Sequence, residues 1–203
     1  MKNIITVQHT QSVHHTNGMV GSWTDWDLTE QGKAEADCIG RKLGDELKEK
    51  DVALYSSDLK RARQTADEIA KYLGTEPVLR QELRERNLGK CCGKSVQWLR
   101  ENLECQEKTV DDRLFSDGES RRDAWKRLLP FYQEIMAGDK ENIVIVSHGD
   151  LLGIWNAMFL GLEVESLQQI DIHGAAGGIS HMSVDGNGKH HVSNINDMSY
   201  TGS

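Results

Sequence analysis

The sequence has no long hydrophobic run, few prolines and few cysteines. Its 203 residues include 2 prolines and 4 cysteines. The start, MKNIITVQHT, holds one lysine and an apolar stretch too brief for a secretory signal or a membrane-spanning helix. Low-complexity linkers, blocks of like charge and internal repeats are also missing. We therefore expect one domain that covers residues 1–203, located in the cytoplasm.

An excess of positive charge is missing as well, because the formal net charge is −8. This balance argues against nucleic acid or an anionic membrane as a partner. The cysteines show no C-x-x-C spacing, so we expect free thiols rather than disulfides or a metal site. They are Cys38, Cys91, Cys92 and Cys105.

Two short apolar runs each lead to a histidine. Residues 3–7 are followed closely by His9, and residues 143–146 by His148. Continuous apolar runs of this length are typical of central parallel strands that are covered on both faces. Ligands of such sheets bind beyond the carboxyl ends of the strands. The two histidines are therefore predicted to share one pocket.

The rest of the chain alternates between predicted strands and predicted helices. Further strands are expected at residues 52–55, 77–79, 179–184 and 191–195, the last two joined by a turn at residues 185–188. Segments with helical spacing of apolar residues follow Thr29, Asp58, Gly118 and His148. This alternation predicts a three-layer α/β/α sandwich with a mostly parallel central sheet.

Local signals refine these helices. Thr29 and Asp58 are expected to cap the first two, and Glu119 the third. Pro130 should kink or divide that third helix. Residues 10–28 are predicted as a polar loop, and residues 84–107 as loop with irregular helix.

Five motifs together resemble those of a known family. They are GSWTDWDLTEQG at 21–32, SSDLKRARQTA at 56–66, LRERNLG at 83–89, SDGES at 116–120 and VSHGD at 146–150. Their order and spacing over nearly the whole chain resemble the histidine phosphatase superfamily, also called phosphoglycerate mutase-like. The resemblance implies the same α/β/α fold and hydrolysis of phosphate monoesters through a phosphohistidine.

The resemblance also implies roles for individual residues. His9 resembles the phosphorylated nucleophile, Glu85 the proton donor and His148 the second catalytic histidine. The expected phosphate-binding residues are Gln8, His9, Ser12, His15, Arg61, His148 and Gly149. Considered alone, Arg61 would also fit a solvated helix arginine, and helical periodicity does not separate it from Lys60 and Arg63. Glu85 would likewise fit a solvated charged loop.

The chemistry explains why these residue types are needed. A neutral imidazole nitrogen can attack phosphorus if the other ring nitrogen is held as a donor. Cationic donors stabilise the charge on the transferring phosphoryl group, and a carboxylic acid protonates the leaving alkoxide. This scheme needs no metal and no other cofactor. The expected partner is a small-molecule phosphate ester, and a homodimer remains open for the assembly.

One departure from the family pattern matters. The usual opening is Arg-His-Gly-Glu-Thr or Ser, and here it reads Gln-His-Thr-Gln-Ser from Gln8 to Ser12. Losing one charge-assisted contact should cost about 1–3 kcal/mol of phosphate or transition-state stabilisation. His14 and His15 stand where the family often has Trp-Asn. If protonated beside a phosphate they would compensate, and otherwise they are solvated loop residues.

Three other functions compete with a phosphatase. A phosphoglycerate mutase is disfavoured because the segment between Glu85 and Asp117 is short and acidic. A phosphate-binding pseudophosphatase would explain the altered opening but not the retention of the catalytic residue types. A metal site built from the His14-His15 and His190-His191 pairs lacks a recognised ligand spacing.

Overall fold

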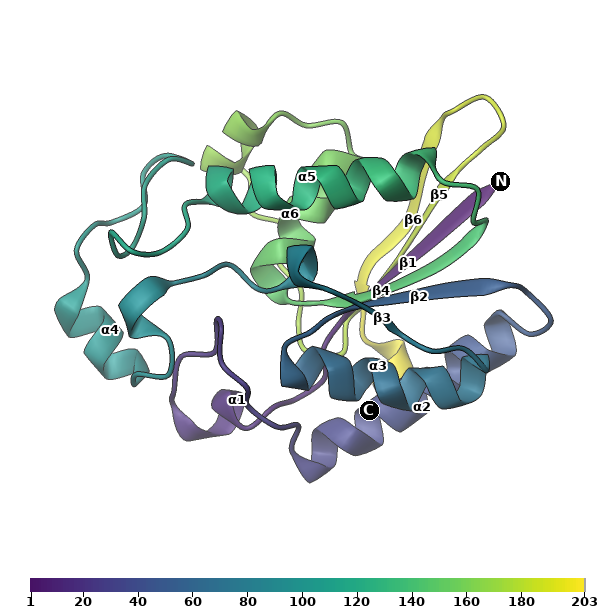
Figure 1. The fold of residues 1–203 in the computed structure, drawn as a ribbon, viewed down its shortest axis with the longest axis horizontal. Coiled ribbons are helices and arrows are strands. Elements are labelled where there is room, and N and C mark those ends of the chain that lie inside the picture. Colours follow the sequence, from purple (N-terminus) through teal and green to yellow (C-terminus); the bar gives the residue numbers. More distant parts are fainter. Residues whose placement is uncertain (203) are drawn as a thin grey trace.

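A computed structural model describes residues 1–202 and shows a twisted six-stranded sheet between layers of helices (Figure 1). The strand order is β3-β2-β4-β1-β5-β6. The first four of these strands pair in parallel, whereas β5 pairs antiparallel with both of its neighbours, β1 and β6. The strands are β1 (Lys2–Gln8), β2 (Val52–Ser57), β3 (Val78–Arg80), β4 (Asn142–Ser147), β5 (Ile179–Val184) and β6 (His190–Asp197). The predicted strands and the mostly parallel sheet are therefore confirmed.

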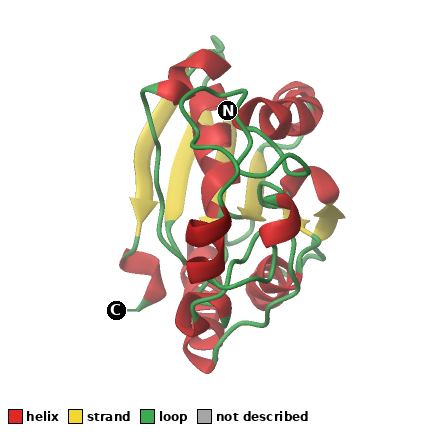
Figure 2. Ribbon diagram, turned by 90° about the vertical axis from the view of Figure 1, so that its left-hand side faces the viewer, coloured by secondary structure: helices red, strands yellow, loops and turns green. Residues whose placement is uncertain are grey.

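The helices occupy three places. In Figure 1, α2 and α3 lie below the sheet, α5 and α6 lie above it, and α1 and α4 lie beyond the strand ends. Figure 2, seen from that last side, shows loops and helix ends in front of the strands. The helices are α1 (His14–Asn17), α2 (Glu30–Glu46), α3 (Lys60–Leu73), α4 (Val96–Asn102), α5 (Arg121–Ala137) and α6 (Gly149–Phe159). This is the predicted α/β/α sandwich, and within residues 1–202 no helix has the length and apolar character to cross a bilayer.

Successive side chains of the central strands point to opposite faces of the sheet and pack against the helices on each face. On β4, Ile143 and Ile145 pack with the α5 and α6 side chains, whereas Val144 and Val146 pack with those of α2 and α3. All four are buried. Because both faces are covered, the strand is apolar at every position and shows no period of two in the sequence.

Two predicted helix caps are wrong. Asp58 does not cap α3; instead its carboxylate accepts hydrogen bonds from Arg84 Nε at 2.7 Å and Nη2 at 2.6 Å. The cap of α5 is Ser120, whose hydroxyl accepts from the Asp123 amide, rather than Glu119. In both cases an arginine competes for the carboxylate, since Glu119 pairs with Arg127.

Two further predictions also need correction. Pro130 does not divide α5, which runs unbroken from Arg121 to Ala137, and the alternative of a kink at Pro130 stays a prediction. Pro130 is exposed, so water can reach the carbonyl that it leaves without a helical donor. The loop predicted at residues 10–28 contains the short helix α1, which sequence periodicity cannot reveal in a single turn.

Candidate active site

The ends of β1 and β4 bring His9 and His148 together. The two strands pair in parallel with Gln8 opposite Ser147, and the His9 amide donates to the Ser147 carbonyl at 2.9 Å. The two imidazole rings follow directly, with centroids 5.1 Å apart and planes inclined by 63°. Both side chains are buried. The structure thus places the two strand-end histidines in one site, as the apolar runs indicated.

The His9 ring is held in one tautomer. Its Nδ1 lies 2.8 Å from the Thr10 carbonyl, which can only accept, so Nδ1 carries the hydrogen. Its Nε2 then has a free lone pair, which accepts from Arg61 Nε at 3.0 Å. Burial and the neighbouring Arg61 charge lower the pKa of His9 well below its usual range. His9 is therefore a neutral imidazole whose Nε2 is suited to act as a nucleophile.

Arg61 is buried in the floor of the site, not solvated on the helix surface. It is 1% exposed, and its Nη1 and Nη2 donate to the carbonyls of Thr24 at 2.8 Å and Ser22 at 2.9 Å. Burial lowers the pKa of Arg61 to about 10, which leaves it protonated at neutral pH. Ser22 has a positive φ of 50°, a conformation uncommon for residues other than glycine. This conformation directs the Ser22 carbonyl toward the Arg61 guanidinium.

His148 is fixed by Ser57 at the end of β2. Its Nε2 lies 2.8 Å from Ser57 Oγ, which already accepts from the Leu59 amide at 3.2 Å. In the tautomer whose Nε2 accepts from the Ser57 hydroxyl, Nδ1 carries the ring hydrogen. Among residues 1–202 this buried Nδ1 has no hydrogen-bond partner. Burial lowers the pKa of His148, so the ring is neutral and has one N–H donor to offer an anion.

Opposing influences act on the Glu85 carboxyl group. It accepts hydrogen bonds from the amides of Arg86 at 2.9 Å, Asp150 at 3.3 Å and Leu151 at 3.2 Å. The last two belong to the first turn of α6, where donors favour the ionised form. Burial and the nearby Asp150 charge outweigh them and raise the pKa of Glu85 to about 7. Near neutral pH this carboxyl group can both donate and accept a proton.

The loop that carries Glu85 is held through its backbone. Arg127 on α5 donates to the carbonyls of Glu82 at 2.7 Å, Arg84 at 3.0 Å and Glu85 at 3.2 Å. The indole of Trp23 also donates to the Glu85 carbonyl, at 2.6 Å. These bonds fix the carboxyl group relative to the sheet without occupying it.

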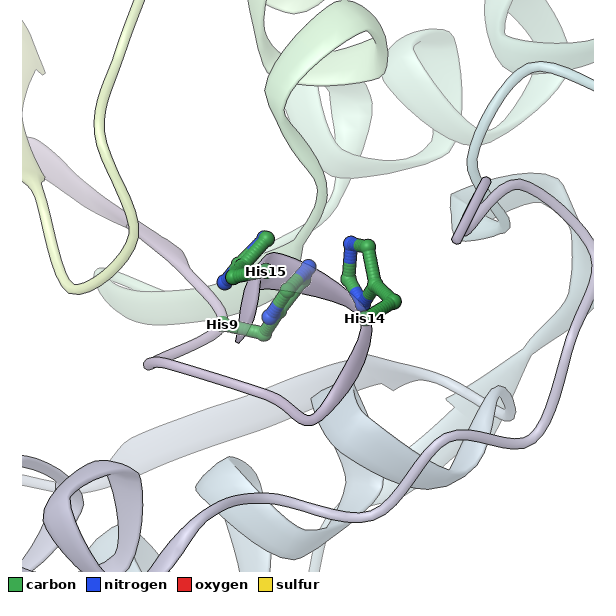
Figure 3. Close-up of side chains that lie close together, drawn as sticks. All are labelled: His9, His14 and His15. Atoms are coloured by element: carbon green, nitrogen blue, oxygen red, sulfur yellow. The ribbon is translucent and has the colours of Figure 1, made fainter. Parts of the chain in front are cut away.

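His14 and His15 lie beside His9 on the helix α1 (Figure 3). The ring centroids of His9 and His15 are 5.4 Å apart, and those of His9 and His14 are 5.8 Å apart. Burial lowers the pKa of His14 to about 3, and burial and Arg61 lower the pKa of His15. Without an anion beside them, these rings are therefore neutral and do not replace a missing arginine.

Ser12 lies next to the histidine pair. It is buried, its hydroxyl contacts His14 Nδ1, and its amide donates to His15 Nδ1 at 3.3 Å. Ser12 therefore orients both rings, and its contact with phosphate stays a prediction.

Gln8 and Gly149 adjoin one another at the other end of the site. Measured from ideal positions, a Cβ on Gly149 would lie 3.3 Å from Gln8 Nε2, and one on Gly174 would lie 2.8 Å from Gln8 Oε1. The Gln8 side chain thus packs between the start of α6 and the loop that precedes β5. It still borders the same cavity as His9.

A cavity of about 270 Å³ lies over these groups. The residues that line it are Gln8, His9, His14, His15, Val20, Gly21, Ser22, Arg61, Glu85, Arg86, Leu88, Gly149, Asp150, His173 and Gly174. His148 lies behind this lining, next to His9.

Sequence reasoning missed Arg86, the residue next to Glu85. Arg86 is buried, its guanidinium contacts the Glu107 carboxylate, and its Nη2 lies 3.3 Å from Asp150. Its position next to Glu85 in the LRERNLG motif was the feature of the sequence that could have identified Arg86 as a residue of the site. Two carboxylates thus offset the Arg86 charge, whereas Arg61 is bound by carbonyl groups.

The fold and this site define an α/β protein with two adjacent histidines beside a cavity at the carboxyl ends of parallel strands. The sequence model of the histidine phosphatase superfamily (branch 1) matches residues 4–197. The chain belongs to this superfamily.

Named relatives include phosphatases and mutases. A protein of Hydrogenobacter thermophilus with the provisional name phosphoserine phosphatase 2 is 30% identical over 191 residues, covering 92% of this chain and 91% of its own. The 2,3-bisphosphoglycerate-dependent phosphoglycerate mutase of Bartonella tribocorum is 30% identical over 172 residues, covering 80% and 82%.

Solved structures share the whole fold. Mycobacterial glucosyl-3-phosphoglycerate phosphatase superposes with a TM-score of 0.82 at 22% identity, covering 96% of this chain and 98% of its own. YhfR of Bacillus stearothermophilus superposes with a TM-score of 0.82 at 24% identity, covering 99% and 100%. Because both sequence identities are below 25%, these two superpositions show a shared fold and not a shared activity.

The protonation states give a prediction that does not depend on activity. In ¹⁵N spectra of the histidine rings, His9, His14 and His148 should stay neutral from pH 5 to 8, because burial lowers the pKa of each. His181 should titrate above its usual pH, because Glu46 raises its pKa. Protonation of His9 or His148 within that range would contradict the site as described.

Proposed function

We propose that this protein is a phosphatase that hydrolyses a small organic phosphate monoester through a phosphohistidine on His9. The observation that carries the proposal is the His9 ring, with Nδ1 bound to the Thr10 carbonyl and the Nε2 lone pair facing Arg61. The family membership and the phosphatases among the named relatives support it.

In the first step His9 Nε2 attacks phosphorus, and the bond from phosphorus to the ester oxygen breaks. The Thr10 carbonyl stabilises the positive charge that develops on the ring. Protonated Glu85 gives its proton to the leaving alkoxide, which departs as the alcohol. In the second step ionised Glu85 takes a proton from water as the water oxygen attacks phosphorus, which releases inorganic phosphate and restores His9.

The charge on the phosphoryl oxygens needs positioned donors. Arg61 lies at His9 Nε2 and supplies a fixed positive charge once its Nε hydrogen bond moves from the ring to the phosphoryl group. The unpartnered Nδ1–H of His148 supplies a neutral donor. Gln8 at the end of β1 replaces a charged donor with a neutral one, which weakens this set.

Hydrolysis is favoured over a mutase reaction by the balance of charge in the pocket. A bisphosphorylated intermediate would need a second cationic site. The arginines that line the cavity are Arg61 and Arg86. Since Glu107 and Asp150 offset the charge of Arg86, one phosphate group has a strong partner and a second does not.

The function is tested by a turnover screen over a panel of phosphate monoesters, run with and without EDTA. We expect release of inorganic phosphate from at least one small ester, at equal rates in both conditions, because His9, Arg61 and Glu85 supply nucleophile, charge and proton. Tight phosphate binding without turnover would instead identify a pseudophosphatase. Loss of activity in EDTA, with recovery on adding a divalent ion, would contradict the metal-free scheme.

The covalent intermediate gives a second prediction. Rapid quenching during turnover of a ³²P-labelled ester should trap one acid-labile phosphate per chain, because a phosphorus–nitrogen bond hydrolyses in acid. His9→Ala should trap none. His173→Ala, which removes another histidine of the cavity lining, should still form the adduct. An acid-stable adduct would contradict attack by an imidazole.

Glu85 should set the basic limb of the pH profile. Because its pKa is raised to about 7, the protonated form that donates to the alkoxide is lost above that pH. For an alkyl phosphate, kcat/KM should therefore fall about tenfold per pH unit above pH 7. Glu85→Gln should lower kcat/KM by about 10²–10⁴-fold and flatten this limb.

A matched substrate separates this role from simple damage to the site. p-Nitrophenyl phosphate has a leaving group that needs no proton. Glu85→Gln should lower the phosphorylation step much less with this ester than with the alkyl ester. Equal losses with both esters would count against Glu85 as the acid.

Replacing Gln8 should improve catalysis. Gln8 borders the cavity at the position where the family pattern has an arginine. Gln8→Arg should tighten inorganic phosphate binding and raise kcat/KM by an amount worth about 1–2 kcal/mol. Gln8→Met keeps the length without charge or hydrogen bonds and should lower both. If Gln8→Arg shows no gain, the missing arginine at position 8 does not limit phosphate binding or catalysis.

A further inference from the structure

Three histidines converge at one wall of the cavity. A ligand nitrogen from each of His9, His14 and His15 lies within 4.8 Å of the others. Figure 3 shows the rings side by side, with His14 and His15 on the turn of chain that follows His9. The centroids of His14 and His15 are only 4.0 Å apart. Arg61 Nε donates to His9 Nε2 at 3.0 Å, so an ion bound to this nitrogen has to displace that hydrogen bond.

This arrangement has the chemistry of a metal site. Three imidazoles with an open fourth position are a known ligand set for Zn²⁺, with Zn–N distances of about 2.0–2.1 Å. Such distances bring ligand nitrogens to about 3.4 Å from one another in a tetrahedral site. The observed 4.8 Å spread therefore has to contract. His14 and His15 can provide this movement, since they lie on a helix of 4 residues at the protein surface.

The contacts behind the rings match those of metal-binding histidines. Such histidines donate their second ring nitrogen to an oxygen, which fixes the ligand nitrogen. His9 Nδ1 does so to the Thr10 carbonyl at 2.8 Å, and His14 Nδ1 contacts the buried Ser12 hydroxyl. His15 differs, because its Nδ1 accepts from the Ser12 amide at 3.3 Å, and this contact has to change when His15 binds an ion. Two of the three ligands are therefore oriented in advance.

The second histidine pair of the sequence is not part of this cluster. His190 Nδ1 lies 2.7 Å from the Phe159 carbonyl, and His191 Nε2 lies 3.3 Å from Asp185. The structure thus joins His14 and His15 with His9, whereas the sequence interpretation had considered the two pairs together.

We propose that His9, His14 and His15 bind one transition-metal ion of the Zn²⁺ type, and that the bound ion blocks phosphoryl transfer. The ion takes the lone pair of His9 Nε2, which then cannot attack phosphorus. Arg61 gives up its hydrogen bond to this nitrogen and keeps those to Thr24 and Ser22. The metal binding stands on the geometry alone, and only the inhibition rests on the proposed function.

The test measures binding directly. Protein freed of metal with EDTA and then of EDTA is titrated with Zn²⁺ by calorimetry and with Co²⁺ by visible absorption, in phosphate-free buffer at pH 7.5. We expect one ion per chain and Co²⁺ bands typical of four-coordinate nitrogen ligation. His14→Ala and His15→Ala should each weaken binding by more than about 100-fold, the upper range for losing a mere outer-shell partner.

The double variant His190→Ala/His191→Ala is the matched control, because it removes two adjacent histidines outside the cluster. It should bind as the unmodified chain does. His14→Gln and His15→Gln, checked for folding by circular dichroism, replace any alanine variant that unfolds. No ion bound at 1:1, or binding that survives loss of both His14 and His15, would overturn the site.

The inhibition is measured separately on an ester that the enzyme turns over. Zn²⁺ should inhibit at the concentrations that saturate the calorimetric site, and EDTA should restore the rate. Binding without inhibition, or with activation, would overturn the inhibitory role and leave the site. An inactive enzyme that still binds Zn²⁺ would overturn the proposed function and not the site.

Discussion

The parallel pairing of β1 with β4 is the interaction on which the site depends. Its register sets Gln8 opposite Ser147, so that both strands end at one level and both deliver a histidine there. A slip of one residue would exchange the side chains on the two faces of β1, where Ile4 and Ile5 pack into opposite clusters. The hydrophobic core therefore fixes the distance between the histidines more firmly than their own polar contacts do.

Burial then decides how each charged group behaves. Arg61 and Arg86 are both buried beside the cavity, but Arg61 is bound by carbonyl groups and Arg86 by carboxylates. Carbonyl oxygens satisfy the guanidinium hydrogens without cancelling the charge, so burial and then the field of Arg61 lower the pKa of His9 and keep it neutral. The same field is available to a phosphoryl group. The paired Arg86 instead fixes the wall beside Glu85.

The sequence predicted the layers and the strand-end histidines, because short apolar runs and helical periodicity report the buried elements whatever loops join them. The sequence predicted fewer of the contacts made by the loops. Asp58 was assigned to a helix cap because its nearest neighbours suggested one, yet its partner Arg84 lies 26 residues away. The Ser22 carbonyl at Arg61 is a backbone contact with no residue-type signature. The motifs identified which side chains to consider, and the tertiary structure determined what each one touches.

The change at Gln8 links anion binding and the histidine cluster. Arg61 already lines the cavity that Gln8 borders, and an arginine at position 8 would add a second positive charge to it. Like charges repel more strongly in a partly buried site than in water. Glutamine adds no such charge, and a cation at His9 Nε2 then has to displace only the hydrogen bond from Arg61. Because these imidazoles are already neutral, a metal ion would displace no proton from them. In both proposals the neutral His9 Nε2 is the reacting atom, as a nucleophile toward phosphorus in one and as a ligand toward a metal in the other, so the two partners compete for the same lone pair.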